Sequence, residues 1–407
     1  MSKTLLVLGA GRDQLFMIRT ARLMGLRVIA LDQNSDSPGF PEADFSAVVS
    51  TRDLPAMLEF VDNYQENFGP IHGVSTMGSD IPQMVGALAR YLGTPTISER
   101  SAHWATEKYE MKERFRQAGV RVPWFQLVNS ASAVREFFAE RGGPMVLKPV
   151  DQAGSRGVSL LQHAEEAERL FAHAFENSGN GGVLLEDFVP GAQLSTESIM
   201  MDGDIYTLGY ADRNYEQMRT FLPHIIENGG WVPSVYEDQR RLVETEIKKA
   251  ALALNINDGV IKGDVVLASE GPVIIEIAAR LSGGDFSESL VPLGTGINYV
   301  ETVIRLALGE RPNIKALLPK SRQVVANRYF FAKPGMLEKV RGIDRVSDLD
   351  WIAKLELWYQ PGDVLPDISN HGQRTGVFVV TGPDRKTVQE RIDSVYQEVE
   401  FEISPVV

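Results

Sequence analysis

The sequence contains no cysteine, which excludes disulfides, zinc-thiolate sites and a cysteine nucleophile. Long basic runs are also absent, and 41 Lys and Arg against 54 Asp and Glu give a net charge of −13. This balance argues against a general binder of nucleic acid or anionic membrane. No apolar segment approaches the roughly 18 residues of a membrane span, and the N-terminal apolar run leads into glycine rather than a cleavage site. We therefore expect a cytoplasmic protein with neither a nucleic-acid nor a membrane partner.

A chain of 407 residues that is 43% hydrophobic predicts two or three domains with ample cores. Near the N-terminus, the turn Gly9-Ala10-Gly11 and the acidic Asp32 suggest a dinucleotide-type fold, but Gln14 stands where the third glycine of that fingerprint belongs. We keep the doubly wound topology and do not expect a bound dinucleotide. The predicted elements of this N-terminal domain are strands at residues 3–8, 27–31 and 72–75 and helices at residues 13–24 and 81–91.

Residues 261–285 are the most informative stretch, because two apolar runs flank the turn-forming residues 269–272 and predict a β-hairpin. With Glu270 at the centre of the turn, Asp264 lies directly opposite Glu276, with Cβ atoms roughly 5 Å apart. Two like charges this close repel each other unless a cation lies between them, and Mg²⁺ prefers oxygen ligands. The alternative is a structural ion pair between Glu276 and Arg280, four residues later.

Two further segments carry groups suited to phosphates and to an adenine ring. Lys148 lies on a predicted strand that leads into the small-residue loop 153–157, whose free N–H groups suit phosphates. A plain hairpin turn with exposed charges is the alternative. The apolar strand 183–189 ends at Pro190-Gly191, and the backbone groups of such a hinge can pair with the edge of an adenine.

Residues 98–118 predict a single helix that bears Lys108 and Lys112 on one face, where lysines are usually solvated. Residues 211–237 predict a polar, irregular segment facing substrate. In that segment His224 is a candidate general base or a surface histidine. From about residue 318 the chain is strand-rich and ends with a helix and a short tail. The strands expected there span residues 324–331, 354–359 and 375–381.

Taken together and in this order, the pieces resemble the ATP-grasp superfamily, specifically its carboxylate–amine ligases, which include L-amino acid ligases, phosphoribosylglycinamide synthetase and biotin carboxylase-like enzymes. The likeness covers roughly residues 1–310 and extends more weakly to the end. It implies an α/β fold, α+β in places, with an N-terminal dinucleotide-like parallel sheet. The implied domains are a pre-ATP-grasp domain at residues 1–100, an ATP-grasp domain at 101–315 with a lid subdomain at about 120–190, and a strand-rich C-terminal domain at 316–407.

The resemblance also implies roles for individual residues. Asp264 and Glu276 would ligate Mg²⁺, or Mn²⁺ in its place. The residues implied to contact ATP are Lys108, Lys148, Gly154, Ser155, Arg156, Gly157, Glu186, Asp187, Phe188, Val189 and, for the ribose, Gln193 or Glu197. The residues implied to act on the reacting groups are Arg280, Ser282 and Gly283, and those that would face the substrate are Arg213, Arg219, His224 and Gly284.

Three departures from the family pattern matter for these roles. The position that usually gives a ribose-binding glutamate falls near Gln193, which leaves the ribose contact open between Gln193 and Glu197. Ala278 stands where many members have an asparagine metal ligand, so the metal shell must be completed otherwise. Residues 229–233 replace a histidine-containing substrate loop of some amino-acid ligases, so His224 cannot be assigned that histidine's role.

The expected function is ATP-dependent joining of a carboxylate to an amine through an acyl phosphate. Both substrates are expected to be small molecules, namely amino acids. A homodimer is expected by analogy with the family. One alternative is a bicarbonate-using enzyme of the purine pathway or of the biotin-carboxylase type, because Gly362-Asp363 and residues 374–376 resemble the C-terminal domain of such carboxylases. A non-catalytic ATP-binding regulator is the second alternative, and a dehydrogenase is the third.

Overall fold

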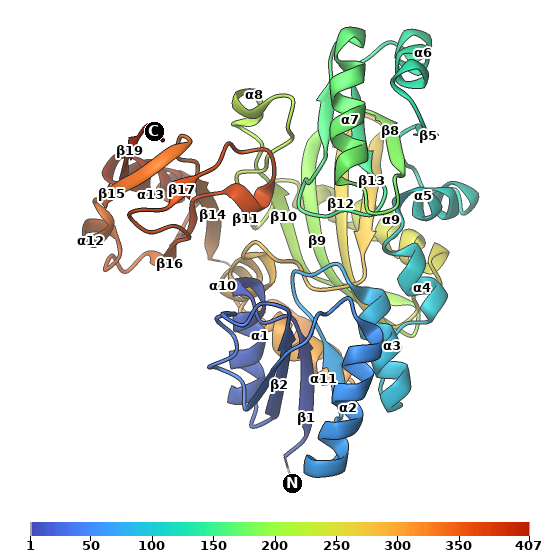
Figure 1. Cartoon of the computed structure of the whole chain (residues 1–407), viewed down its shortest axis with the longest axis vertical. Coiled ribbons are helices and arrows are strands. Elements are labelled where there is room, and N and C mark those ends of the chain that lie inside the picture. The colour runs from blue at the N-terminus through green and yellow to red at the C-terminus, as the bar shows by residue number, and fades with distance from the viewer. Residues whose placement is uncertain (1, 322, 407) are drawn as a thin grey trace.

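The computed structural model describes residues 2–321 and 323–406, which form four sheets arranged as three lobes around a centre (Figure 1). The N-terminal lobe lies at the bottom of the view and the C-terminal lobe at the left. The sheet and helices of residues 125–187, called the lid below, lie at the upper right. No helix among the described residues is long and apolar enough to cross a membrane.

The N-terminal lobe is a parallel sheet of order β3-β2-β1-β4 with helices on both faces, as predicted. Strand β1 is buried at every position and apolar from Leu5 to Leu8, and its alternate side chains pack in opposite directions. Leu5 and Val7 face α1 and the distant α11, whereas Leu6 and Leu8 face α2 and α3. The elements are β1 (Thr4–Leu8), α1 (Arg12–Leu23), β2 (Arg27–Asp32), β3 (Phe45–Val48), α2 (Leu54–Phe68), β4 (Gly73–Ser75), α3 (Pro82–Leu92) and α11 (Tyr299–Ala307).

The single helix predicted at residues 98–118 is wrong. The chain forms two helices, α4 (Glu99–Trp104) and α5 (Lys108–Gln117), each with its own N-cap. Ser98 accepts from the Ser101 N–H and Glu107 accepts from the Glu110 N–H, and side-chain caps of this kind start a new helix. The break brings Lys108 to the first position of α5.

The central sheet has eight strands in the order β13-β12-β9-β10-β11-β14-β18-β16. One face of its hairpin end is covered by α5 and α9 through a shared apolar core. Residues 211–237 are less irregular than predicted, because they include the end of β10 and all of β11. The elements are β9 (Ala192–Met201), β10 (Asp204–Arg213), α8 (Met218–Phe221), β11 (Gly230–Val232), η2 (Glu237–Gln239), α9 (Arg240–Ala253), β12 (Gly259–Ala268), β13 (Gly271–Ala278), η3 (Phe286–Leu290) and α10 (Val291–Thr295).

The predicted hairpin is present as β12 and β13, and Asp264 pairs with Glu276. The path to this register differs from the prediction. The turn is centred between Ser269 and Glu270, which by itself would place Asp264 opposite Ile275. A β-bulge between the Asp264 and Val265 pairs leaves Ile275 as an extra residue and restores the pairing of the two carboxylates.

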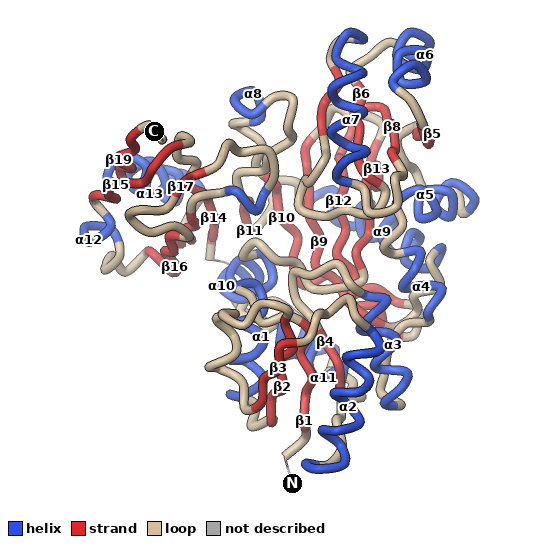
Figure 2. The backbone as a smooth tube through the Cα atoms, in the orientation of Figure 1, coloured by secondary structure: helices blue, strands red, loops and turns tan. Residues whose placement is uncertain are grey.

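The lid is a four-stranded sheet of order β5-β8-β6-β7 with α6 and α7 packed on it through an apolar core. It projects from the central sheet, as the tube in Figure 2 shows. Its elements are β5 (Phe125–Val128), α6 (Ala131–Arg141), β6 (Met145–Pro149), β7 (Ser159–Leu161), η1 (Ala164–Glu166), α7 (Ala167–Asn177) and β8 (Val183–Asp187).

The C-terminal region contributes three strands to the central sheet, because β14 pairs with β11 and then with β18. A separate three-stranded sheet, β17-β15-β19, lies beside them, so the expected short tail is in part a strand. The elements are η4 (Ile314–Leu317), β14 (Val324–Phe330), β15 (Gly335–Arg341), α12 (Ile343–Val346), β16 (Ile352–Leu357), β17 (Val364–Leu365), η5 (His371–Gln373), β18 (Gly376–Gly382), α13 (Arg385–Glu398) and β19 (Glu400–Ser404).

Candidate active site

A cavity of about 1150 Å³ lies where the lid, the hairpin, the N-terminal lobe and the C-terminal lobe meet. Most of the residues singled out from the sequence line it. These are Lys108, Lys148, Gly154, Ser155, Arg156, Glu186, Asp187, Phe188, Val189, Gln193, Arg213, Asp264, Glu276, Arg280, Ser282, Gly283 and Gly284.

Four predicted residues do not line the cavity, namely Gly157, Glu197, Arg219 and His224. Arg219 is exposed on the short helix α8. The His224 ring packs against the ring of His173 on α7, with 5.2 Å between their centres, so His224 lies against the lid.

The facing carboxylates of β12 and β13 are surrounded by cations. Asp264 accepts from Arg213 at 2.8 Å and also from Lys262. Glu276 lies 3.9 Å from the Lys108 ammonium. Burial would raise the pKa of Glu276, but Lys108 and Lys262, with weaker contributions from other cations, hold it below its ordinary value. Glu276 is therefore anionic at neutral pH and available to a cation.

Two buried lysines meet at one carboxylate beneath the lid. Glu186 on β8 lies 2.9 Å from Lys148 and 3.0 Å from Lys112, and all three side chains are almost fully buried. Lys112 also donates to the backbone oxygen of Ile275, the bulge residue, at 2.9 Å. Burial, and to a lesser extent Lys148, lowers the pKa of Lys112 to about 8. Lys112 therefore connects the lid to the bulge that aligns the two carboxylates, and the expected solvated lysine face is wrong.

The small-residue loop of the lid crosses the cavity toward the C-terminal lobe. The Gly154 backbone oxygen accepts from the His371 N–H at 3.0 Å, and the Ser155 hydroxyl lies 3.2 Å from His371 Nε2. Gly157 ends the loop with φ +71°, and a Cβ there would meet Pro149 at 2.6 Å. The loop is thus in contact with both sides of the cavity.

The hinge after β8 leaves one backbone donor free. The Asp187 N–H donates to Trp124 O and the Phe188 N–H to Pro144 O, whereas the Val189 N–H has no acceptor among residues 2–321 and 323–406. The Asp187 carboxylate is engaged by Arg141 through two hydrogen bonds, of 2.8 and 2.6 Å. This arrangement suits an adenine edge to which the Val189 N–H donates, so the backbone rather than the Asp187 carboxylate would contact the base.

Of the two ribose candidates, only Gln193 lines the cavity. Glu197 is 1% exposed and accepts from Ser287 at 3.2 Å. Burial raises the pKa of Glu197 to about 7. The structure therefore gives Gln193 access to a ligand and gives Glu197 an interior position.

Arg280 and the loop 282–284 lie at the junction with the N-terminal lobe. Arg280 faces Asp80 at 3.6 Å. A Cβ on Gly283 would come within 2.9 Å of the Asp13 carboxylate, so this close approach requires glycine. The Ser282 hydroxyl is buried without a partner in the described chain.

Several cavity residues were not identified from the sequence, including Lys262, Glu227, Tyr329, His371 and Arg374. Lys262 is two residues before Asp264 on the same face of β12, so strand alternation could have found it. Arg374 belongs to residues 374–376, which were noted above only for a likeness to carboxylases. The other three residues lie more than 30 residues along the chain from Asp264 and carry no local signal. In the N-terminal lobe, Gln14 accepts from the Gly11 N–H at 3.0 Å and fills the glycine turn.

The donor set was compared with the needs of Mg²⁺. In the described part of the chain no three His, Asp or Glu side chains gather as a metal site. Mg²⁺ is commonly held by one or two carboxylates together with substrate phosphates and water. Asp264 and Glu276 fit that pattern, so they would hold the ion only when phosphates complete its shell.

Comparison with known proteins identifies two domains. Residues 105–284 match the ATP-grasp domain, and residues 328–404 match the L-amino acid ligase C-terminal domain 2. The first match spans the site from Lys108 to Gly284.

Three relatives indicate the range of similarity. An uncharacterized protein, y4rH, of Sinorhizobium fredii is 26% identical over 97% of this chain and 81% of its own length. The L-arginine-specific L-amino acid ligase of Bacillus subtilis is 21% identical over 74% of this chain and 72% of its own. The crystal structure of the L-amino acid ligase from Bacillus licheniformis has the same fold, with a TM-score of 0.84 and 19% identity over 99% of both chains.

Proposed function

The chain is an ATP-grasp ligase, an enzyme that forms carbon–nitrogen bonds and releases ADP, and we propose that it joins a carboxylic acid to an amine through an acyl phosphate. The observation that carries this proposal is the pair of facing carboxylates, Asp264 and Glu276, within a group of lysines and arginines. The pair lies in a cavity that continues from the lid to loop 282–284.

In the first step, an oxygen of the acid attacks the γ-phosphorus of ATP, and the bond to the ADP oxygen breaks. Lys108 and Lys148 bind phosphate oxygens, and Arg280 neutralises charge on the transferring group. Asp264 and Glu276 would hold Mg²⁺, which would supply further charge neutralisation when bound. Val189 and Gln193 orient the adenine and the ribose.

In the second step, the amine attacks the acyl carbon and inorganic phosphate leaves. Arg280 and the N–H groups of loop 282–284 stabilise the oxyanion that develops on the acyl oxygen. Water would hydrolyse an acyl phosphate, so the cavity must be closed before the transfer. The contacts of His371 with Gly154 and Ser155 support closure by the lid loop.

The experiment measures ADP release with ATP and Mg²⁺ over a panel of carboxylic and amino acids, with hydroxylamine present to trap activated acyl groups. A hydroxamate formed with one acid confirms acyl activation and identifies the donor. Release of ADP with bicarbonate alone and no hydroxamate would replace the proposal with the carboxylase alternative. Binding of ATP without turnover on any acid would favour the regulatory alternative.

A homodimer remains a prediction from the resemblance. Light scattering coupled to size-exclusion chromatography gives the mass of the particle in solution, and a monomer mass would contradict it.

A further inference from the structure

One arginine of the cavity, Arg374, is buried without an anionic partner. It follows η5 in the C-terminal lobe, is 4% exposed and lines the cavity. Among the described residues, no Asp or Glu oxygen lies within 4.0 Å of its guanidinium nitrogens. The neighbouring carboxylate of Glu227 is engaged by Arg213 through two hydrogen bonds. Arg374 also lowers the pKa of Glu227, so the two arginines share this one carboxylate. A buried cation without a full counter-charge is costly, and this position therefore favours an anion that the chain itself does not supply.

The contacts of Arg374 fix its orientation but leave donors unused. One terminal nitrogen donates to the backbone oxygen of Glu227 at 2.5 Å, and the guanidinium carbon lies 3.7 Å from the centre of the Tyr329 ring. The Nε atom is buried without an acceptor. A planar guanidinium held on an aromatic face, with free N–H groups, matches the two oxygens of a carboxylate.

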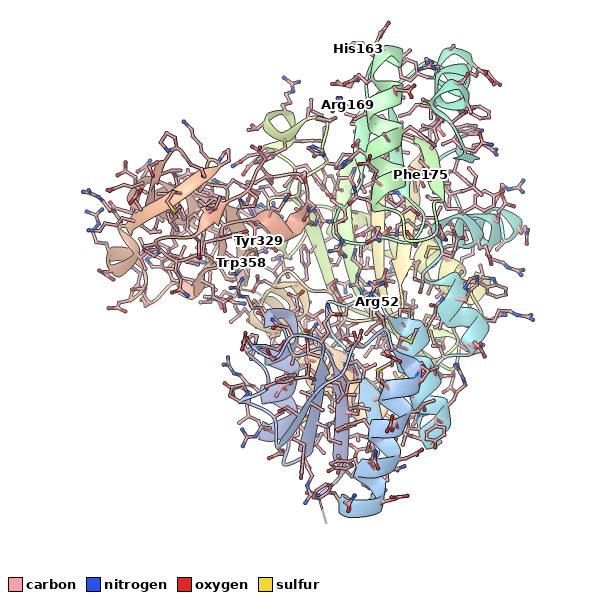
Figure 3. All side chains as sticks on the ribbon, in the orientation of Figure 1. Arg52, His163, Arg169, Phe175, Tyr329 and Trp358 are labelled. Atoms are coloured by element: carbon pink, nitrogen blue, oxygen red, sulfur yellow. The ribbon has the colours of Figure 1, made fainter. Side chains whose placement is uncertain are left out.

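Arg374 lies close to the loop that would hold the acyl carbon. The Tyr329 hydroxyl donates to the backbone oxygen of Gly284 at 2.9 Å, and the guanidinium stacks on the same ring. Figure 3 labels Tyr329 and Trp358, which lie together at the edge of the C-terminal lobe that faces the centre of the molecule. One tyrosine ring therefore separates Arg374 from loop 282–284.

His371, three residues before Arg374, lies among cations. Burial, together with Arg374 and Arg213, lowers the pKa of His371 well below its ordinary value. His371 is neutral at pH 7 as a result and does not compete for an anion.

We propose that Arg374 binds the non-reacting carboxylate of the amine substrate, which makes that substrate an α-amino acid rather than a simple amine. The proposal rests on the proposed ligase function. In the proposed mechanism the reacting carboxylate of the acid substrate lies beside Lys108 and Arg280, so it is not the anion that Arg374 holds. In an α-amino acid one carbon separates the amine from the carboxylate, so a carboxylate on Arg374 directs the amine toward loop 282–284.

The test uses the acid that gives a hydroxamate and supplies each standard amino acid or its α-carboxamide as the amine. The wild type, Arg374→Gln, Arg374→Lys and the control Arg345→Gln are compared by kcat/KM. Arg345 is an exposed arginine of the same lobe, with 68% of its side chain accessible. Thermal melts establish whether each variant is folded. If Arg374→Gln does not fold, Arg374→Lys, which retains the positive charge, carries the comparison.

We expect Arg374→Gln to lower kcat/KM for the amino acid on the order of 100-fold, with a change of less than about threefold for the carboxamide. Arg374→Lys should lose about tenfold for the amino acid, because it keeps the charge but not the planar fork. An equal loss for amino acid and carboxamide, or no loss for either, overturns the assignment of Arg374 while leaving the ligase intact. Absence of hydroxamate from the wild type refutes the ligase function and this inference with it.

Discussion

Replacement of Glu197 by Gln should make the protein more stable at neutral and alkaline pH. Glu197 is 1% exposed, and burial raises its pKa from 4.5 to about 7. Below pH 4.5 the carboxyl is protonated in both the folded and the unfolded chain. Between pH 4.5 and 7 the unfolded chain ionises while the folded chain stays protonated, so stability falls as pH rises. Above pH 7 both states are ionised and the loss is constant.

The magnitude follows from the size of the shift. One pKa unit corresponds to about 1.4 kcal/mol, so the shift of Glu197 costs the wild type about 3 kcal/mol of unfolding free energy above pH 7. Glutamine retains the acceptor for the Ser287 hydroxyl and has no charge to desolvate. The variant should therefore match the wild type at pH 4 and exceed it by up to about 3 kcal/mol at pH 8.

The assay is denaturant unfolding of wild type and Glu197→Gln from pH 4 to 8, read as the difference between the two curves so that other titrating groups cancel. Glu270→Gln, at the exposed hairpin turn, is the control and should give no difference. Parallel curves, or a variant that is less stable at pH 8, would refute the burial argument.

The same variant separates the two ribose candidates. We expect Glu197→Gln to leave KM for ATP unchanged, because Glu197 does not line the cavity, and Gln193→Ala to raise it severalfold. A raised KM in Glu197→Gln alone would contradict this interpretation.

Three further predictions concern the site and its supports. Glu276→Gln should reduce ADP formation at least about 100-fold without unfolding the chain, since it removes an anionic ligand, whereas Glu270→Gln should turn over normally. Gly157→Ala should weaken ATP binding, measured by calorimetry, because a Cβ at this position adds steric strain of about 1–3 kcal/mol. The control Gly25→Ala has a similar φ but open space around the new Cβ, so its effect should be smaller. Lys112→Met should lower the unfolding free energy by about 3 kcal/mol, because it leaves part of a buried carboxylate unpaired, and equal stability to the wild type would show that the pair contributes nothing.

Much of the site was predictable because its signals are local. The parallel N-terminal sheet follows from apolar strands separated by helical patterns, and the facing of Asp264 and Glu276 follows from a hairpin. Even there, the prediction reached the correct pair through a turn misplaced by half a residue. The bulge at Ile275 compensated for it, and no pattern in the sequence marks that bulge.

Local patterns misjudged residues whose surroundings are set by distant segments. Lys112 looked like part of a solvated helix face, yet it is buried against Glu186 on the lid and the carbonyl of Ile275. Glu197 looked like a ribose ligand by spacing, yet its side chain lies in the interior. Burial is a property of what packs over a residue, so spacing along one strand cannot determine it.

The sequence by itself determined the class of chemistry, because the order of lysines, glycine loop, hinge and paired carboxylates is written along one chain. Tertiary structure alone decided which of those residues share a cavity and what else enters it. Arg374 and His371 come from a segment about a hundred residues beyond the hairpin, and β14 and β18 bring them to it by extending the central sheet. Hydrogen bonding between strands makes these segments neighbours, and the charges that meet there were not adjacent in any sequence window.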